Sequence, residues 1–166
     1  MEDSKDITVE GIAVFSEHFS EYKWPESERE SVCEMKVIDN TLLNKVSTEA
    51  KESPRLRMNY NFHQSLEDKC HRFLNAVEPG TEVPIHRHPT KDESFVLLRG
   101  KVRVSTYTDD GSIKESVVLN PAEGLYGVDI PKGVWHKVES LESGSVFFEC
   151  KEGPFVEHEV DGILNL

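Results

Sequence analysis

Residues 80–100 read Gly80-Thr-Glu-Val-Pro-Ile-His86-Arg-His88-Pro-Thr-Lys-Asp-Glu93-Ser-Phe-Val-Leu-Leu-Arg-Gly100, which is the pattern G-x5-H-x-H-x4-E-x6-G. In a β-strand, side chains two positions apart point to the same face, so His86 and His88 would direct both imidazoles into one space. Glu93 stands at the start of the next apolar run and can add a carboxylate oxygen beside them. This stretch therefore predicts strands that present metal-ligating side chains together.

A third imidazole follows a tight turn further along the chain. The segment Gly124-Leu-Tyr-Gly-Val-Asp-Ile-Pro131-Lys-Gly133-Val-Trp-His136 places this histidine just after a Pro-x-Gly turn. Three imidazole nitrogens and one carboxylate oxygen suit a divalent ion such as Fe(II), Mn(II), Ni(II) or Zn(II), and they leave coordination positions open for water or substrate. We predict one divalent metal ion, held by His86, His88, Glu93 and His136.

Outside these segments the chain consists mainly of short apolar runs separated by turn signals. A helix is predicted after Asp39, its N-cap, because apolar residues recur at helical spacing from Leu42 to Ala50, and Pro54 forbids continuation past Ser53. Many short strands with regular turns are typical of an antiparallel sandwich or barrel. Strands are predicted over residues 56–63, 70–78, 94–99, 101–108, 113–119, 126–130 and 145–151.

Residues 1–34 differ in composition from the rest, with ten acidic and three basic side chains. Within them, Ile7, Val9, Ile12 and Val14 alternate as in a strand with a kink at the intervening glycine. We expect an acidic N-terminal extension whose strand pairs with the barrel or with a second subunit. Residues 35–166 are expected to form the main domain.

The two histidine segments together resemble the paired signature motifs of the cupin superfamily. The first matches at every defining position. The second has six rather than five residues between Gly124 and Pro131, and Ser140 stands where asparagine is common. From about Met35 onward the chain resembles the small WbuC-type cupin metalloproteins, which are found among bacterial O-antigen and surface-polysaccharide genes. Further matching stretches are Ser53-Pro-Arg-Leu-Arg57, Asn59-Tyr-Asn-Phe-His63, Glu78-Pro-Gly80 and Phe148-Glu-Cys-Lys-Glu-Gly-Pro154.

The resemblance carries implications for fold and assembly. It implies a mainly all-β protein, namely a double-stranded β-helix or jelly-roll barrel. The short N-terminal helix and the extra N-terminal strand segment predicted above would be added to this barrel. The resemblance also implies a bound metal and a link to sugar or polysaccharide metabolism. Cupin barrels commonly dimerise, so a homodimer is expected.

Polar and apolar side chains alternate along Arg55-Leu-Arg-Met-Asn-Tyr-Asn-Phe-His63. Period two puts the polar set on one face, which either lies in water or binds a carboxylate, a phosphate or sugar hydroxyls. The family resemblance favours ligand binding. Arg72, Tyr126 and Glu149 are weaker candidates for groups that support the metal or the substrate. The predicted substrate-binding residues are Arg55, Arg57, Asn59, Asn61 and His63.

Net charge and hydropathy exclude several classes of function. The formal net charge is −12, and no run of Lys or Arg forms a stripe that could neutralise phosphates, so nucleic acid is not an expected partner. No apolar stretch approaches the roughly 20 residues that span a bilayer, and no signal peptide is recognisable at the N-terminus. Three cysteines without C-x-x-C spacing suit reduced thiols. We therefore predict a cytoplasmic protein without a membrane partner.

Three functions fit these features. The first is an enzyme, an isomerase, epimerase or oxygenase, that acts on a small polar or anionic, sugar-like substrate activated by the metal. The second is a non-catalytic module that binds a sugar or a sugar nucleotide. The third is an assembly component with a purely structural metal. We favour the enzyme, although the sequence identifies no catalytic residue.

Overall fold

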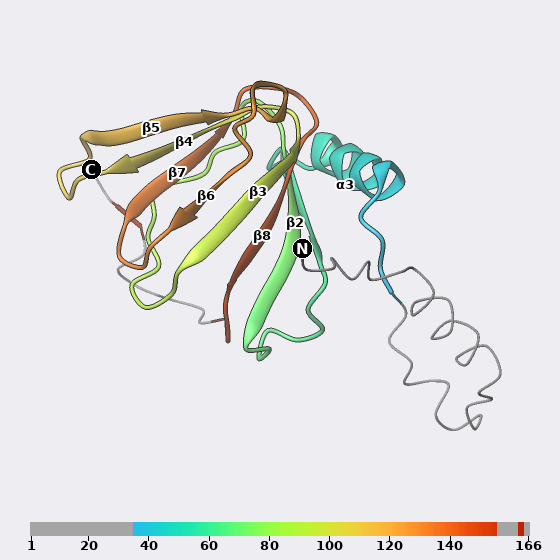
Figure 1. Ribbon diagram of the computed structural model, residues 1–166, viewed down its shortest axis with the longest axis horizontal. Coiled ribbons are helices and arrows are strands. Elements are labelled where there is room, and N and C mark those ends of the chain that lie inside the picture. Colours follow the sequence, from blue (N-terminus) through green and yellow to red (C-terminus); the bar gives the residue numbers. More distant parts are fainter. Residues whose placement is uncertain (1–34, 156–162, 165–166) are drawn as a thin grey trace, which may run out of the picture. The chain divides into compact units, whose positions relative to one another are not determined.

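The computed structural model describes residues 35–155 and 163–164. Residues Ile38–Leu166 form a compact unit distinct from Met1–Val37, and the fold below is that of the former. The predicted strand from Ile7 to Val14 lies outside the described residues. The elements are α3 (Asn40–Glu52), β1 (Arg57–Asn61), β2 (Cys70–Val77), β3 (Glu93–Arg99), β4 (Val102–Tyr107), β5 (Ile113–Leu119), η1 (Pro121–Glu123), β6 (Gly127–Ile130), β7 (Trp135–Ser140) and β8 (Ser145–Glu152) (Figure 1).

The strands form two antiparallel sheets. One has the order β1-β2-β8-β3-β6 and the other the order β5-β4-β7. An isolated bridge between His86 and His136 adds the segment before β3 to the edge of β7. Because β8 lies between β2 and β3, distant parts of the chain are neighbours in one sheet, as in a jelly roll. The predicted all-β cupin jelly roll is confirmed.

The hydrophobic core lies between the two sheets, and its pattern determines which polar residues point inward. In β3, burial alternates strictly, so Glu93 shares the inner face with Phe95 and Leu97. A one-residue change of register would turn this carboxylate outward. The other buried members of this cluster are Val77, Val102, Val104, Leu119, Ile130, Val138 and Phe147.

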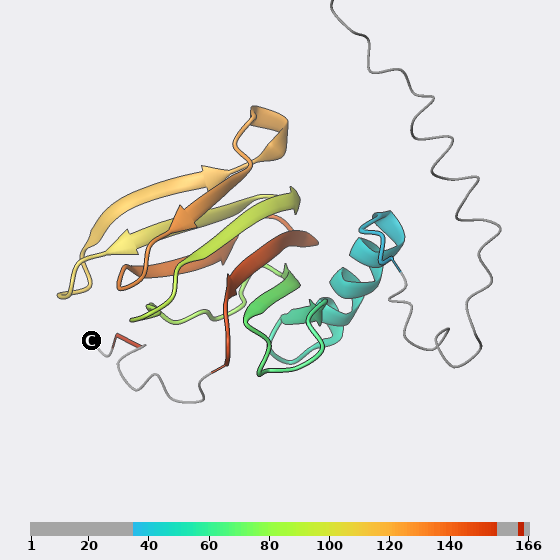
Figure 2. The same cartoon turned by 60° about the horizontal axis from the view of Figure 1, so that its bottom comes forward.

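Helix α3 begins and ends where the sequence predicts. The Leu42 amide donates a hydrogen bond of 2.9 Å to Oδ1 of Asp39, the N-cap, and Ser53 is the C-cap. The helix packs on the outer face of the five-stranded sheet, over β1, β2 and β8 (Figure 2). Its buried side chains join a second apolar cluster composed of Leu43, Val46, Ala50, Leu74, Ala76 and Val146.

Arg99 at the end of β3 ties helix α3 to the barrel. Its Nε donates to the carbonyl of Gly144 at 3.1 Å. Its two terminal nitrogens donate to Oδ1 of Asn44 at 2.7 Å, the carbonyl of Leu43 at 3.0 Å and Oγ of Ser47 at 2.5 Å. One guanidinium therefore satisfies acceptors on both the helix and the loop before β8.

We expect Arg99→Met to lower the free energy of unfolding by about 2–4 kcal/mol, because several partly buried acceptors lose a charged donor. Urea unfolding followed by circular dichroism measures this loss. Arg103→Met is the matched control, since Arg103 is exposed and, among the described residues, its guanidinium forms a surface ion pair alone, 3.8 Å from Glu139. The control should change stability by less than about 1 kcal/mol. Equal losses in the two variants would contradict the role given to Arg99.

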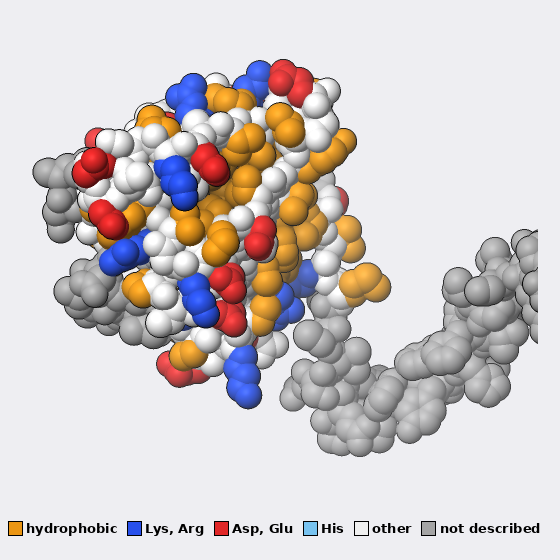
Figure 3. Space-filling view, turned by 60° about the vertical axis from the view of Figure 1, so that its left-hand side comes forward, with side chains coloured by type: hydrophobic (Ala, Val, Ile, Leu, Met, Phe, Trp, Pro, Cys, Tyr) orange, Lys and Arg blue, Asp and Glu red, His pale blue; other side chains and the backbone are white. Residues whose placement is uncertain are grey.

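Part of the outer sheet face is not covered by α3. On β3, Val96 and Leu98 point away from the core and are 46% and 37% exposed. Figure 3 shows hydrophobic side chains gathered in a band on one face of the molecule.

The homodimer stays a prediction. No described helix is long and apolar enough to cross a membrane.

Candidate metal centre

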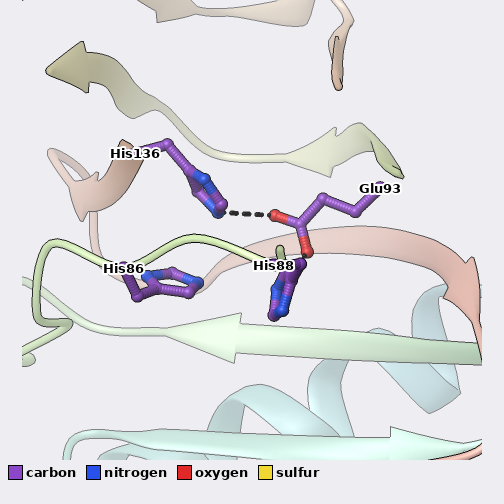
Figure 4. Close-up of side chains that lie close together, drawn as sticks. All are labelled: His86, His88, Glu93 and His136. Atoms are coloured by element: carbon purple, nitrogen blue, oxygen red, sulfur yellow. Dashed lines mark ion pairs between the residues drawn. The ribbon is translucent and has the colours of Figure 1, made fainter. Parts of the chain in front are cut away.

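Four side chains converge inside the barrel. His86, His88, Glu93 and His136 each offer a ligand atom, and these atoms all lie within 4.8 Å of one another. Nε2 of His88 is 3.1 Å from one Glu93 oxygen, and Nε2 of His136 is 2.8 Å from the other. Figure 4 shows the Glu93 carboxylate between these two rings, with the His86 ring beside the same space. The predicted ligands are thus close enough to hold one divalent metal ion.

Backbone pairing brings the two histidine segments together. The His86 amide donates to the His136 carbonyl at 3.0 Å, and the His136 amide donates to the His86 carbonyl at 2.8 Å. The Gly133 amide donates to the His88 carbonyl at 2.8 Å. The spacing predicts a regular strand here, but within residues 84–88 only His86 forms isolated β-bridges. The side chains nevertheless converge, because Glu93 enters from β3 on the inner face.

The rings of His86 and His136 are oriented for metal binding. Nδ1 of His86 lies 3.0 Å from the Pro84 carbonyl, and Nδ1 of His136 lies 2.9 Å from the Val134 carbonyl. A carbonyl can only accept, so each Nδ1 donates its proton and each Nε2 keeps its lone pair in the neutral ring. Such a hydrogen bond is the usual support of a metal-binding histidine. The donor set therefore fits a metal ion.

Electrostatics favour the protonation state that a metal needs at His86 and Glu93 but oppose it at His136. Burial, and then the charge of His136, lower the pKa of His86 to about 4, so this imidazole is neutral near pH 7. Burial raises the pKa of Glu93, but hydrogen bonds from His136 and His88 outweigh it and hold that pKa well below its usual range. Burial lowers the pKa of His136, but the bond to Glu93 outweighs it and the pKa is raised. Metal binding would therefore displace the proton that His136 holds beside the Glu93 carboxylate.

Arg87, which stands between His86 and His88 in the sequence, makes a second set of contacts that the sequence does not predict. The Arg87 guanidinium lies 4.2 Å from the centroid of the Trp135 ring. The Trp135 indole donates to Oδ1 of Asp109 at 2.8 Å, and the same oxygen is 4.0 Å from Arg87. These contacts join the neighbours of His86 and His136 in sequence, so they fix the spacing of the two ligand segments.

A cavity of about 450 Å³ adjoins the cluster, and His86 and Glu93 form part of its wall. Phe73, Phe95, Phe147 and Phe155 supply apolar wall. The polar lining consists of Arg55, Arg57, Asn59, Asn75, Glu149 and Lys151. A small polar molecule can therefore contact both the cluster and the polar strand β1.

The five predicted substrate-binding residues fall into two groups, of which one lines the cavity and the other does not. Arg55, Arg57 and Asn59 line the cavity, and their binding of substrate stays a prediction. Asn61 and His63 are not part of the lining. Asn61 is exposed and accepts a hydrogen bond of 2.8 Å from Asn59. His63 lies beyond the end of β1, is buried, and stacks on another histidine, His71, with ring centroids 4.3 Å apart.

The three weaker candidates for groups that support the metal or the substrate also differ in their positions. Glu149 lines the cavity, whereas Arg72 and Tyr126 are exposed and do not. Asn75 and Lys151 were not predicted, yet they hold Glu149. The Asn75 amide donates to Glu149 at 2.6 Å, and the Lys151 ammonium is 2.9 Å from its other oxygen. Burial raises the pKa of Glu149 to about 7, although the charge of Lys151 opposes this. The spacing of Glu149 and Lys151, two apart in a predicted strand, was an available signal.

Fold and site together define a cupin barrel with an inward cluster that could bind a metal ion. A family model described as "Domain of unknown function (DUF6016)" matches residues 38–119. A search of curated protein sequences gave no match.

Many solved structures resemble the chain, among them the following three. Two are of CapF, the capsular polysaccharide assembling protein of Staphylococcus aureus. The first is 25% identical with a TM-score of 0.53, and the match covers 64% of this chain and 28% of CapF. The second contains the inhibitor 3-isopropenyl-tropolone and is 25% identical with a TM-score of 0.52. Its match covers 64% of this chain and 31% of CapF. The third is TT1209 of Thermus thermophilus, 21% identical with a TM-score of 0.51, covering 71% and 97%. This chain thus spans less than a third of CapF. The likeness to TT1209, at 21% identity, supports a shared fold and nothing further.

Proposed function

We propose that this protein is a metal-dependent enzyme that acts on a small polar or anionic, sugar-like substrate. The observation that carries the proposal is the position of the cluster. Its four ligand atoms lie within 4.8 Å of one another, and two of the four residues form part of the wall of a polar cavity. Three imidazoles and one carboxylate leave coordination positions for exogenous ligands on a five- or six-coordinate ion.

Each part of the site has a separate task in this proposal. His86, His88, Glu93 and His136 would hold the ion, which polarises substrate oxygens or lowers the pKa of bound water. Arg57 and Asn59 offer donors to the substrate from strand β1. The phenylalanine walls exclude water and offer flat faces to a sugar ring. Asn75 and Lys151 fix the Glu149 carboxylate at the cavity wall.

A role in surface-polysaccharide metabolism is part of the proposal. CapF is described as a capsular polysaccharide assembling protein, and the likeness at 25% identity supports a related setting. The resemblance of the chain from about Met35 onward to the WbuC-type cupin metalloproteins supports the same setting. Cytoplasmic localisation and a homodimer complete the proposal.

The inhibitor of CapF offers a probe of the metal site. Tropolones carry adjacent carbonyl and hydroxyl oxygens that chelate a metal with two open positions. We expect 3-isopropenyl-tropolone to raise the melting temperature of the metal-loaded protein and to have no effect on His86→Ala. If the tropolone leaves the melting temperature of the metal-loaded protein unchanged, the coordination shell of the ion is closed. That result would favour a purely structural metal.

Turnover distinguishes an enzyme from a binding module. The metal-loaded protein is incubated with a panel of sugar nucleotides, and ¹H NMR follows isomerisation or epimerisation while an oxygen electrode follows oxidation. We expect a product with the wild-type protein and none with Glu93→Gln, because the amide cannot supply the anionic ligand. Binding of a sugar nucleotide without any product would identify a binding module instead.

A further inference from the structure

Two arginines at one wall of the cavity have no acidic partner among the described residues. Arg57 is the first residue of β1, Arg55 precedes it by two positions, and both line the cavity. Among residues 35–155 and 163–164, no carboxylate lies within 4.0 Å of either guanidinium. Within the same part of the chain, Nε of Arg57 is buried and has no hydrogen-bond partner. A buried donor of this kind lowers stability unless something accepts its hydrogen bond.

The arginines also repel each other. Burial, and then the charge of Arg55, lower the pKa of Arg57 from its ordinary value. Two like charges at one wall of a cavity create a positive potential that attracts an anion. Their side chains offer planar forks of N–H donors, which match the two oxygens of a carboxylate or a phosphate.

The two carboxylates that line the same cavity form hydrogen bonds and ion pairs with residues other than the two arginines. Glu93 contacts the histidines of the cluster, and Glu149 is held by Asn75 and Lys151. Neither carboxylate lies within ion-pair distance of Arg55 or Arg57. The cavity therefore offers the positive charge of the arginine pair to a ligand.

We propose that the Arg55–Arg57 pair binds an oxyanion of the substrate, a phosphate or a carboxylate, while the rest of the molecule extends across the cavity toward the metal cluster. That the bound anion belongs to a substrate rests on the proposed function, whereas the anion site itself does not require catalysis. Asn59, two positions further along β1, faces the same cavity and can bond a hydroxyl next to the anion.

Titration calorimetry with inorganic phosphate tests the site. Because phosphate can also ligate a metal, the titration uses both the metal-loaded protein and the metal-free His86→Ala variant. We expect binding in both, and we expect Arg57→Gln in each background to weaken it by about tenfold to a hundredfold, the loss typical of a charge-assisted hydrogen bond. The matched control is Arg103→Gln, an exposed arginine on β4, which should leave the affinity unchanged.

Further titrations identify the oxyanion. Glucose 1-phosphate and glucuronate present a phosphate and a carboxylate on the same ring, and glucose presents neither. The proposal expects at least one of the two anions to bind more tightly than glucose, and expects Arg57→Gln to remove that preference. If Arg57→Gln fails to fold by circular dichroism, Arg55→Gln takes its place. Equal affinity of wild type and variant for all three sugars would overturn the anion site.

The outcomes separate this inference from the proposed function. Anion binding that survives in His86→Ala, together with no turnover in the metal-loaded wild type, would retain the anion site and reject the enzyme. Turnover by the wild type with phosphate affinity unchanged in Arg57→Gln would retain the enzyme and reject the anion site.

Discussion

Replacing His86 by alanine is expected to reduce the metal content of the purified protein from about one ion per chain to near zero. The change removes one of three imidazoles from a four-residue cluster, and its neutral Nε2 is the donor best prepared for a metal. His86 is partly exposed and belongs to neither apolar cluster, so the fold should persist. Elemental analysis after dialysis measures the ion, and circular dichroism verifies the fold.

His63→Ala is the matched control for this loss. His63 is a buried histidine that stacks on His71 and does not belong to the cluster. This variant should lose some stability but retain its ion. The double variant His86→Ala/His136→Ala gives the sharpest result, because wild-type metal content in it would disprove the site.

Gly100→Ala is expected to destabilise the fold by about 2–5 kcal/mol, combining left-handed backbone strain with overpacking. Gly100 has φ +88°, and a Cβ there would lie 2.6 Å from Cα of Ser145 and 2.8 Å from its Cβ. Ser145 is fully buried and its Oγ accepts from the Lys101 amide, so it has little room to move. This contact explains the final glycine of the first motif. Urea unfolding measures the effect.

Gly124→Ala separates the two causes. Gly124 has φ +81°, but nothing lies within 4 Å of a Cβ added there. This variant should therefore cost only the backbone strain, about 1–2 kcal/mol. Equal destabilisation in the two glycine variants would show that the approach of Ser145 adds nothing.

The residues of the cluster could be predicted because their signal is local. The spacing of His86, His88 and Glu93 is short, and the turn before His136 is marked by proline and glycine. Helix α3 was predictable for the same reason, since its cap and its apolar spacing lie within one short segment. Such features need no knowledge of which strands become neighbours.

Strand β7 and half of the cavity could not be predicted. In β7 a histidine takes an inner position between buried Trp135 and Val138, so the alternation of a strand is hidden. Asn75 and Glu149 meet only because β2 pairs with β8, and that pairing depends on the whole fold. Alternation predicts that His63 lies on the polar face, but β1 ends at Asn61 and the alternation ends with it. Tertiary pairing and strand ends thus limit the prediction.

The reciprocal backbone bonds of His86 and His136 have a consequence for the behaviour of the protein in a cell. They join segments far apart in the chain, and an ion bound between the same residues would act as a cross-link that the unfolded chain cannot form. At a free ion concentration of a hundred times the dissociation constant, such a link adds about 2.7 kcal/mol to the free energy of unfolding. The resistance of the protein to proteolysis, and with it its abundance, would then rise and fall with the supply of the metal.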